Sequence, residues 1–142
     1  MNKDEIIRQI FFTIDIKQFK FWGIVFDSLK TDKKHRFVWA TIKYDDYKEF
    51  QSDKSLRQST ATAFFQSFKD TDFAILLVEQ SKEKVNIGFR SRMGLDVSKI
   101  AVEFGGGGHQ YAAGAGTEGI SLEEVEKKVL KVARKYAKKS KK

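Results

Sequence analysis

Residues 105–114 spell GGGGHQYAAG, and this stretch carries the strongest structural signal in the chain. Four consecutive glycines leave the backbone free to adopt positive φ and let another molecule approach the main chain. Their N–H groups can converge on an anion, and the histidine that ends the run can hydrogen-bond a phosphate or carry a proton. The stretch therefore predicts a phosphate-binding loop, made of Gly105, Gly106, Gly107, Gly108 and His109.

A flexible linker is the alternative interpretation of a glycine run. The preceding residues argue against it, because 96–104 are apolar at Val97, Ile100, Ala101 and Phe104. This is helical spacing, and Asp96 is a suitable N-cap. An ordered amphipathic helix is expected to lead directly into the glycines.

Strand patterns lie on either side of this helix and loop. Residues 37–42 are rich in β-branched and aromatic side chains, and 73–78 form a continuous apolar run that is typical of a central strand. Residues 85–91 alternate, with Val85, Ile87 and Phe89 facing one way and Asn86, Gly88 and Arg90 the other. A short edge strand is expected at 115–117.

Helical spacing of apolar residues accounts for much of the remaining chain. The predicted helices cover residues 3–12, 17–30, 45–50, 55–68 and 96–104, and a last one follows the capping box that begins at Ser121. The sequence therefore predicts an α/β domain in which helices pack a mixed β-sheet, with an N-terminal helical connector and a C-terminal basic helix.

The length and composition of the chain narrow the class of protein. A chain of 142 residues fits one domain, and the absence of cysteine excludes disulfides and thiolate metal sites. No apolar run reaches the ~18 residues of a membrane span, and the N-terminus lacks the pattern of a secretory signal. We expect a cytoplasmic protein that does not enter membranes.

The net charge of +8 belongs to one end of the chain. Nine cations and no acid occur after residue 126, namely Lys127, Lys128, Lys131, Arg134, Lys135, Lys138, Lys139, Lys141 and Lys142. Without these nine, 18 cations face 19 acids, a net charge of −1. The run is either a solvated helix end, favoured by the helix dipole, or a patch that attracts a polyanion.

Arginine is concentrated where a ligand is expected. Arg90 and Arg92 flank Ser91 at the C-terminal end of the 85–91 strand, although lysine is otherwise much preferred in this chain. Ligands of α/β sheets tend to bind beyond that end, and the guanidinium fork suits phosphate better than an ammonium group does. The alternatives are a surface ion pair for Arg90, a solvent-facing Arg92, a turn-capping Ser91 and a His109 that bonds only the backbone.

The other histidine and the tryptophans are not expected to belong to a functional site. His35 lies in a lysine-rich turn and is expected at the surface, while Trp22 and Trp39 are expected in the core or an interface. Two histidines are too few for a confident metal cluster, and no P-loop, HExxH motif or serine triad is present. We therefore assign no catalytic and no metal-binding residue to this chain.

Three motifs together resemble a known family. They are IGFRSR at 87–92, DVSKIA at 96–101, and GGGH with the following AAG at 106–114. Their order and spacing are similar to the DHH-associated C-terminal domain of the DHH-family phosphoesterases, in the branch of bifunctional oligoribonucleases and phosphatases of adenosine 3′,5′-bisphosphate. The resemblance is densest over residues 72–135.

The resemblance implies a two-lobed enzyme. An N-terminal DHH lobe would hold two metal ions, usually manganese, and the C-terminal lobe would bind short RNA or nucleotide phosphates. Matched by motif, Arg90 and Ser91 would contact the phosphate or sugar, Gly106, Gly107 and Gly108 would form the loop, and His109 would face the scissile phosphate. The role of Arg92 beside this motif is less defined.

The DHH lobe itself has no counterpart in these 142 residues. Residues 1–30 resemble the connector to that lobe, and 31–142 the substrate-binding domain. We expect the apolar positions Ile6, Ile10, Phe21 and Phe26 to contact the missing lobe, in cis or in trans, or a second subunit. The chain by itself is expected to bind phosphate-bearing substrate weakly, to hold no manganese and to hydrolyse nothing.

Two further interpretations remain open at this stage. The related terminal domain of alanyl-tRNA synthetases has a glycine-rich loop, which keeps a stand-alone module for tRNA or single-stranded nucleic acid as an alternative. A lobe of a cyclic-dinucleotide phosphodiesterase is the other alternative, because such enzymes share the GGGH motif.

Overall fold

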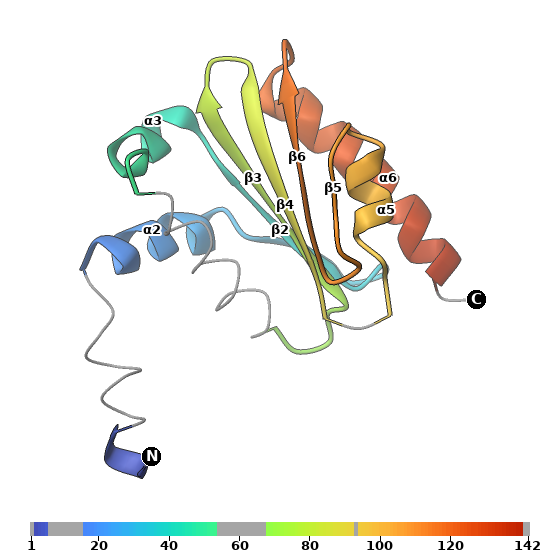
Figure 1. Cartoon of the computed structure of the whole chain (residues 1–142), viewed down its shortest axis with the longest axis horizontal. Helices are drawn as coiled ribbons and strands as arrows, with labels where there is room; N and C mark the ends of the chain where they lie inside the picture. Colours follow the sequence, from blue (N-terminus) through green and yellow to red (C-terminus); the bar gives the residue numbers. More distant parts are fainter. Residues whose placement is uncertain (1, 6–15, 54–67, 93, 141–142) are drawn as a thin grey trace.

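The computed structural model describes residues 2–5, 16–53, 68–92 and 94–140. Six strands form a single sheet in the order β1-β2-β3-β4-β6-β5 (Figure 1). Most of the helix predicted over 3–12, and nearly all of that over 55–68, lies outside the described residues.

The sheet is mixed, as the sequence predicts. Strand β1 (Lys30–Asp32) pairs antiparallel with β2 (Phe37–Ile42), which runs parallel to β3 (Phe73–Ser81). A tight turn then leads into β4 (Lys84–Ser91), which pairs antiparallel with β3 and with β6 (Ala112–Glu118). The two-residue β5 (Gly107–Gly108) pairs antiparallel with the outer side of β6.

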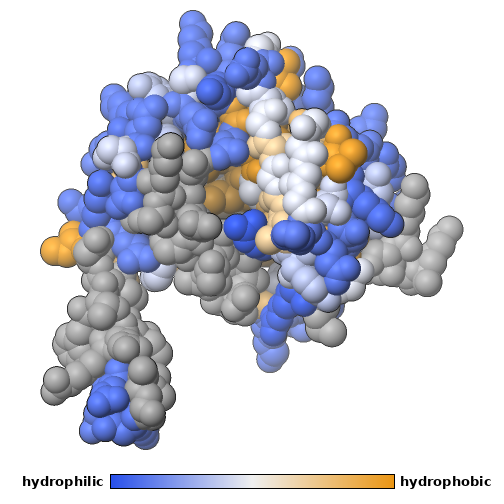
Figure 2. Space-filling view, viewed as in Figure 1, coloured by the Kyte–Doolittle hydropathy of each residue, from blue (hydrophilic) through white to orange (hydrophobic). Residues whose placement is uncertain are grey.

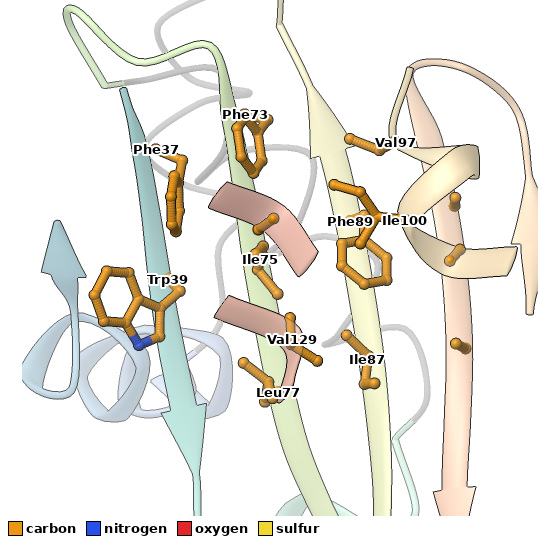
Figure 3. Packing of buried hydrophobic residues seen from close by; sticks show 14 of the residues in the cluster. Phe37, Trp39, Phe73, Ile75, Leu77, Ile87, Phe89, Val97, Ile100 and Val129 are labelled. Atoms are coloured by element: carbon orange, nitrogen blue, oxygen red, sulfur yellow. The ribbon is translucent and has the colours of Figure 1, made fainter. Parts of the chain in front are cut away.

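One face of the sheet is covered by α5 (Ser98–Val102) and α6 (Leu122–Ser140). The predicted alternation is confirmed, since Val85, Ile87 and Phe89 are all buried on this face. Figure 3 shows aromatic and aliphatic side chains from β2, β3 and β4 gathered with Ile100 of α5 and Val129 of α6. Continuous burial across strands and helices makes this the main hydrophobic core.

The opposite face is covered over β2 and β3. Helix α2 (Ile16–Asp27), the short α3 (Tyr44–Tyr47) and the 3-10 turn η1 (Lys48–Phe50) pack there. Phe21 and Val25 of α2 are fully buried against this face. The expectation that Phe21 waits for a missing lobe is therefore wrong, because its ring belongs to the domain's own core.

Over β4 and β6, the described residues leave this opposite face open. Asn86, Gly88 and Arg90 of β4 are partly exposed there, and Gly114 and Gly116 of β6 are exposed. No described helix lies in front of these strands in Figure 1. In Figure 2 a pale strip of intermediate hydropathy extends over this part of the molecule.

Some details of the elements differ from the sequence-based expectation. The strand expected at 115–117 covers Ala112–Glu118 and lies inside the sheet, because β5 takes the edge position. Helix α5 has only five residues, but the Asp96 carboxylate accepts the Ser98 N–H at 3.0 Å, as an N-terminal cap would. The Ser121 hydroxyl accepts the Glu124 N–H at 3.3 Å, which confirms the start of α6.

His35 is less exposed than expected. Its Nδ1 lies 2.9 Å from Asp32 Oδ2, and its side chain is 14 % exposed. Arg134 of α6 donates to the same Asp32 oxygen at 2.8 Å, while Trp39 is buried and donates from Nε1 to Glu126 at 2.8 Å. These contacts fasten α6 to the β1–β2 hairpin.

In the described part of the chain, no helix combines the length and apolar character that crossing a membrane requires.

Candidate phosphate-binding site

Arg90 lies on the open face at the end of β4. It pairs across the ladder with Ala112, the first residue of β6. Its Nη1 donates to the carbonyl oxygen of Phe89 at 2.9 Å, and no described acidic side chain forms an ion pair with it. Burial lowers the pKa of the Arg90 guanidinium from its ordinary value, yet an arginine stays charged. A half-buried cation without an acid is suited to an external anion.

Ser91 is the last residue of β4, and its side chain faces the opposite side of the sheet from Arg90. Its backbone N–H donates to the Tyr111 carbonyl at 2.9 Å. Its hydroxyl oxygen is buried and has no hydrogen-bond partner among the described residues. Buried polar atoms are nearly always hydrogen-bonded, so an orphan hydroxyl at this point needs an explanation such as a ligand or a water molecule.

Arg92 leaves the strand and turns toward the preceding loop. Its side chain is exposed, and Nη1 donates to the Phe68 carbonyl at 2.6 Å, while its N–H donates to the Asp72 carbonyl at 2.7 Å. The structure therefore engages this guanidinium with the domain's own backbone. Within the described part of the chain, Arg90 is the one of the two arginines whose guanidinium bonds only its neighbouring residue.

The glycine run is not an open nest of N–H groups. The N–H groups of Gly105 and Gly106 donate to the carbonyls of Val102 and Ala101 and so close the end of α5. Gly107 and Gly108 form β5, and His109 exchanges hydrogen bonds with Ala112 in both directions. The prediction that all these N–H groups converge on an anion is wrong in this respect. Because antiparallel pairs alternate, Gly107 bonds Gly114 and the Gly108 N–H points to the outer edge.

Three of the four glycines are demanded by the fold. Gly105 has φ +78°, which disfavours any side chain. A Cβ at Gly106 would overlap the backbone of Gly114 and Ala115, and one at Gly108 would stand 2.6 Å from the Ala112 oxygen. A Cβ at Gly107, in contrast, would meet nothing within 4 Å. The close approach to β6 explains Gly106 and Gly108, and the positive φ explains Gly105, so that only Gly107 has no structural explanation.

His109 stands at the tip where β5 turns into β6. The turn bonds of His109 with Ala112, and the ladder pair of Ala112 with Arg90, bring this tip beside the end of β4. The His109 side chain is exposed. The structure thus brings Arg90, Ser91 and His109 to the same end of the sheet, from segments that lie far apart in sequence.

The open face next to Arg90 is unusually bare. Gly88, Gly114 and Gly116 have room for a methyl group, because a Cβ would stand 3.4 Å or more from any other atom. Glycine inside a strand weakens it and often marks a place where another molecule approaches the backbone. Figure 2 shows this region as a pale strip with both hydrophilic and hydrophobic residues beside it.

Asn86 and Tyr111 also belong to this neighbourhood, although the sequence analysis did not single them out as site residues. Asn86 shares the open face with Gly88 and Arg90, and the alternation of β4 was the signal that could have identified it. Tyr111 is 56 % exposed and immediately precedes β6. An exposed aromatic ring beside a basic group can stack on a nucleobase.

Metal ligands are sparse in this region. Within the described ranges, no group of three or more His, Cys, Asp or Glu side chains is placed to hold a metal ion.

Comparison with known proteins gives one family match. The sequence model of the DHHA1 domain matches residues 47–139. Two curated relatives are both named bifunctional oligoribonuclease and PAP phosphatase NrnA. The one from Thermus thermophilus is 37 % identical over 59 residues, which is 42 % of this chain and 18 % of the relative. The one from Mycoplasma genitalium is 28 % identical over 96 residues, 68 % of this chain and 29 % of the relative.

Solved structures show the same fold. An exopolyphosphatase-related protein from Bacteroides fragilis superposes with a TM-score of 0.81 at 24 % identity, over 100 % of this chain and 41 % of that one. The pGpG-specific phosphodiesterase PggH from Vibrio cholerae gives a TM-score of 0.55 at 11 % identity, over 87 % of this chain and 40 % of that one. The chain thus spans less than half the length of each of these proteins.

Proposed function

The chain belongs to the DHHA1 domain family, the accessory domain of DHH-family phosphoesterases, and we propose that it is the substrate-binding lobe of such an enzyme. The proposed substrates are short oligoribonucleotides, adenosine 3′,5′-bisphosphate, or both. The names of the two curated relatives support this substrate class. The chain would supply binding and orientation, and the other lobe would supply the metal ions that activate water.

The unpaired guanidinium of Arg90 is the observation that carries the proposal. It lies half-buried on the open face, and among the described residues its hydrogen-bond partner is the Phe89 carbonyl. A substrate phosphate would complete its hydrogen bonding and compensate its partly desolvated charge. His109, at the adjoining turn, would then contact the same phosphate or the next one along the substrate.

The exposed backbone on the open face of β4 and β6 supports a nucleoside as the part of the ligand that adjoins the phosphate. Gly88, Gly114 and Gly116 leave the backbone of β4 and β6 uncovered beside Arg90. A sugar or a base could lie flat on such a surface, with Asn86 at one end as a hydrogen-bonding group and the Tyr111 ring near the other. In this arrangement the glycines would serve the ligand, since the fold itself has room for larger residues.

Helix α2 supports a second lobe as the partner. Ile16, Phe19 and Phe26 are 75 %, 56 % and 48 % exposed, which is unusual for apolar side chains of this size on one helix. Ile6 and Ile10, expected to share this role, lie outside the described residues. Docking of the DHH lobe, in cis or in trans, would cover the exposed side chains and bring its metal centre to the open face.

The test is a titration of the metal-free chain with adenosine 3′,5′-bisphosphate and with a 5′-phosphorylated RNA trimer, followed by backbone amide NMR. The proposal predicts shifts confined to Arg90, Ser91, residues 105–111 and the open-face positions of β4 and β6. Shifts spread over the basic residues of α6 instead, with none at Arg90, would contradict it.

Substitution of Arg90 sharpens the same test. Arg90→Gln is expected to weaken trimer binding about tenfold to hundredfold, the range for loss of a charge-assisted hydrogen bond. Lys84→Gln is the matched control, because Lys84 is an exposed cation at the opposite end of the same strand. Equal losses in the two variants would mean that only net charge matters and would remove the basis for the site.

A further inference from the structure

The cations of α6 from Lys127 to Lys138 share one face of the helix. At 100° per residue, the six basic positions from Lys127 to Lys138 fall within roughly 120° of arc. The buried residues Val125, Val129 and Ala133 lie on the opposite side, against the sheet. The basic residues therefore form a continuous solvent-facing surface, made of Lys127, Lys128, Lys131, Arg134, Lys135 and Lys138. We call this surface the α6 basic face.

Ion pairs occupy only part of this face. Arg134 pairs with Asp32 at 2.8 Å and Lys135 with Glu103 at 3.2 Å. Among the described residues, no ion pair involves Lys127, Lys128, Lys131 or Lys138, and all four are exposed. The last acid of α6, Glu126, accepts a hydrogen bond from Trp39 and forms an ion pair with Lys30. These four ammonium groups are therefore exposed and have no ion-pair partner among the described residues.

The distribution of charge singles out a polyanion as the partner. Residues 127–142 carry nine cations and no acid, whereas the rest of the chain has a net charge of −1. No large apolar side chain of α6 is among the exposed ones, which are Ile16, Phe19, Phe26, Val102 and Tyr111. A surface without apolar anchors disfavours insertion into a membrane or a hydrophobic protein interface. Lysines as point charges suit a phosphate backbone without sequence preference.

We propose that the α6 basic face binds the phosphate backbone of single-stranded RNA too long for the candidate site. The choice of RNA rests on the proposed function, whereas the polyanion surface itself does not. Helix α6 covers the face of the sheet opposite to Arg90, so the two surfaces are separate. Lys127 and Lys138 are about 16 Å apart along the helix, at 1.5 Å per residue, enough for several phosphates.

The experiment compares the binding of a 20-nucleotide single-stranded RNA with that of the RNA trimer over a range of salt concentrations. The test variant is Lys127→Gln, Lys131→Gln, Lys138→Gln, because glutamine keeps helix propensity close to that of lysine. The control variant is Lys20→Gln, Lys43→Gln, Lys82→Gln, which removes the same charge from exposed positions outside α6. Unfolding curves of both variants establish that the fold is retained.

The test variant is expected to bind the 20-nucleotide RNA about 100-fold more weakly at 0.1 M salt. This value follows from about −0.7 in slope for each of three lost phosphate contacts, taken from 0.1 to 1 M salt. The slope of log K against log salt becomes shallower by about 2, while trimer binding and the control variant stay near wild type. Equal losses in test and control variants, or no loss in either, would overturn the proposal.

Two further arms separate the alternatives. Polyglutamate, or vesicles containing anionic lipid, that compete as well as RNA at equal charge would overturn the assignment to RNA. If the trimer fails to bind while the α6 variants behave as expected, the proposed function fails and the α6 basic face stands.

Discussion

Strands β2 and β3 are covered on both faces, whereas β4 and β6 are covered on only one. In the covered half, Phe37, Ile75 and Leu77 face one core and Val38 and Leu76 face the other. In the half-open part the outward positions include Gly88, Gly114 and Gly116, together with polar side chains such as Asn86 and Arg90. The contrast indicates that the covered half stabilises the fold, whereas the open half carries the proposed binding site, with exposed backbone and with Arg90 outside any ion pair among the described residues.

The largest expected effect tests the covered half. Phe21→Ala removes a fully buried ring that joins α2 to β2 and β3, and it is expected to lower the free energy of unfolding by about 3–5 kcal/mol. Phe19→Ala is the control on the same helix, since Phe19 is 56 % exposed, and a change within about 0.5 kcal/mol is expected. Urea unfolding measures both, and similar losses would mean that α2 is not anchored as described.

The next prediction concerns the junction between β5 and β6. Gly106→Ala forces a methyl group to within 2.7 Å of the Ala115 Cα, so a loss of about 1–3 kcal/mol in the free energy of unfolding is expected. Gly107→Ala meets open space and is expected to stay within about 0.5 kcal/mol of wild type. Chemical denaturation distinguishes them, and a destabilised Gly107→Ala protein would disprove the assigned packing of the glycine run.

A third, smaller effect concerns the attachment of α6. Burial by itself would raise the pKa of Asp32, but hydrogen bonds from Arg134 and His35 lower it to about 2, against an ordinary value of 3.8. The stabilisation is therefore present above pH ~4 and is lost as the pH falls through 2. By linkage the shift corresponds to about 2 kcal/mol at neutral pH.

Asp32→Asn is accordingly expected to lower the free energy of unfolding by about 2 kcal/mol at pH 7 and by much less near pH 2. The measurement is urea unfolding of both proteins over this pH range. Asp45→Asn serves as the control, because the Asp45 side chain is 89 % exposed in its ion pair with Lys48. A deficit that stays constant down to pH 2 would mean that the ionised form of Asp32 is not what holds α6.

The fold was largely predictable from the sequence because its strands carry strong local patterns. The apolar run at 73–78 gave the central strand, and the alternation at 85–91 gave both faces of β4 correctly. The position of β6 was missed, since AAGAGTE has little β-branched or aromatic content and depends on pairing with β4. The strand pairing in the folded protein is what shows that residues 107–108 form the edge strand of the sheet.

The candidate site was predictable in its residues but not in its geometry. The arginines and the glycine run attracted attention by composition, and the ladder brings Arg90 beside the turn at His109. Four consecutive glycines look alike in the sequence, so the sequence could not show which of them close packing requires. It depends on how closely β5 approaches β6, and on whether each missing Cβ would face Ala115, Ala112 or open space.

The smallest expected change in stability bears most directly on the contrast between the two halves. Gly116→Ala places a methyl group on the open face, 3.9 Å from the nearest atom, the Val85 oxygen. Alanine costs less backbone entropy than glycine, so the free energy of unfolding should rise by about 0.5 kcal/mol. If the open face accommodates the ligand, the same substitution should weaken RNA-trimer binding although the protein is more stable. A variant that gains stability and keeps full affinity would mean that the ligand does not reach Gly116, and would confine the site to Arg90, Ser91 and His109.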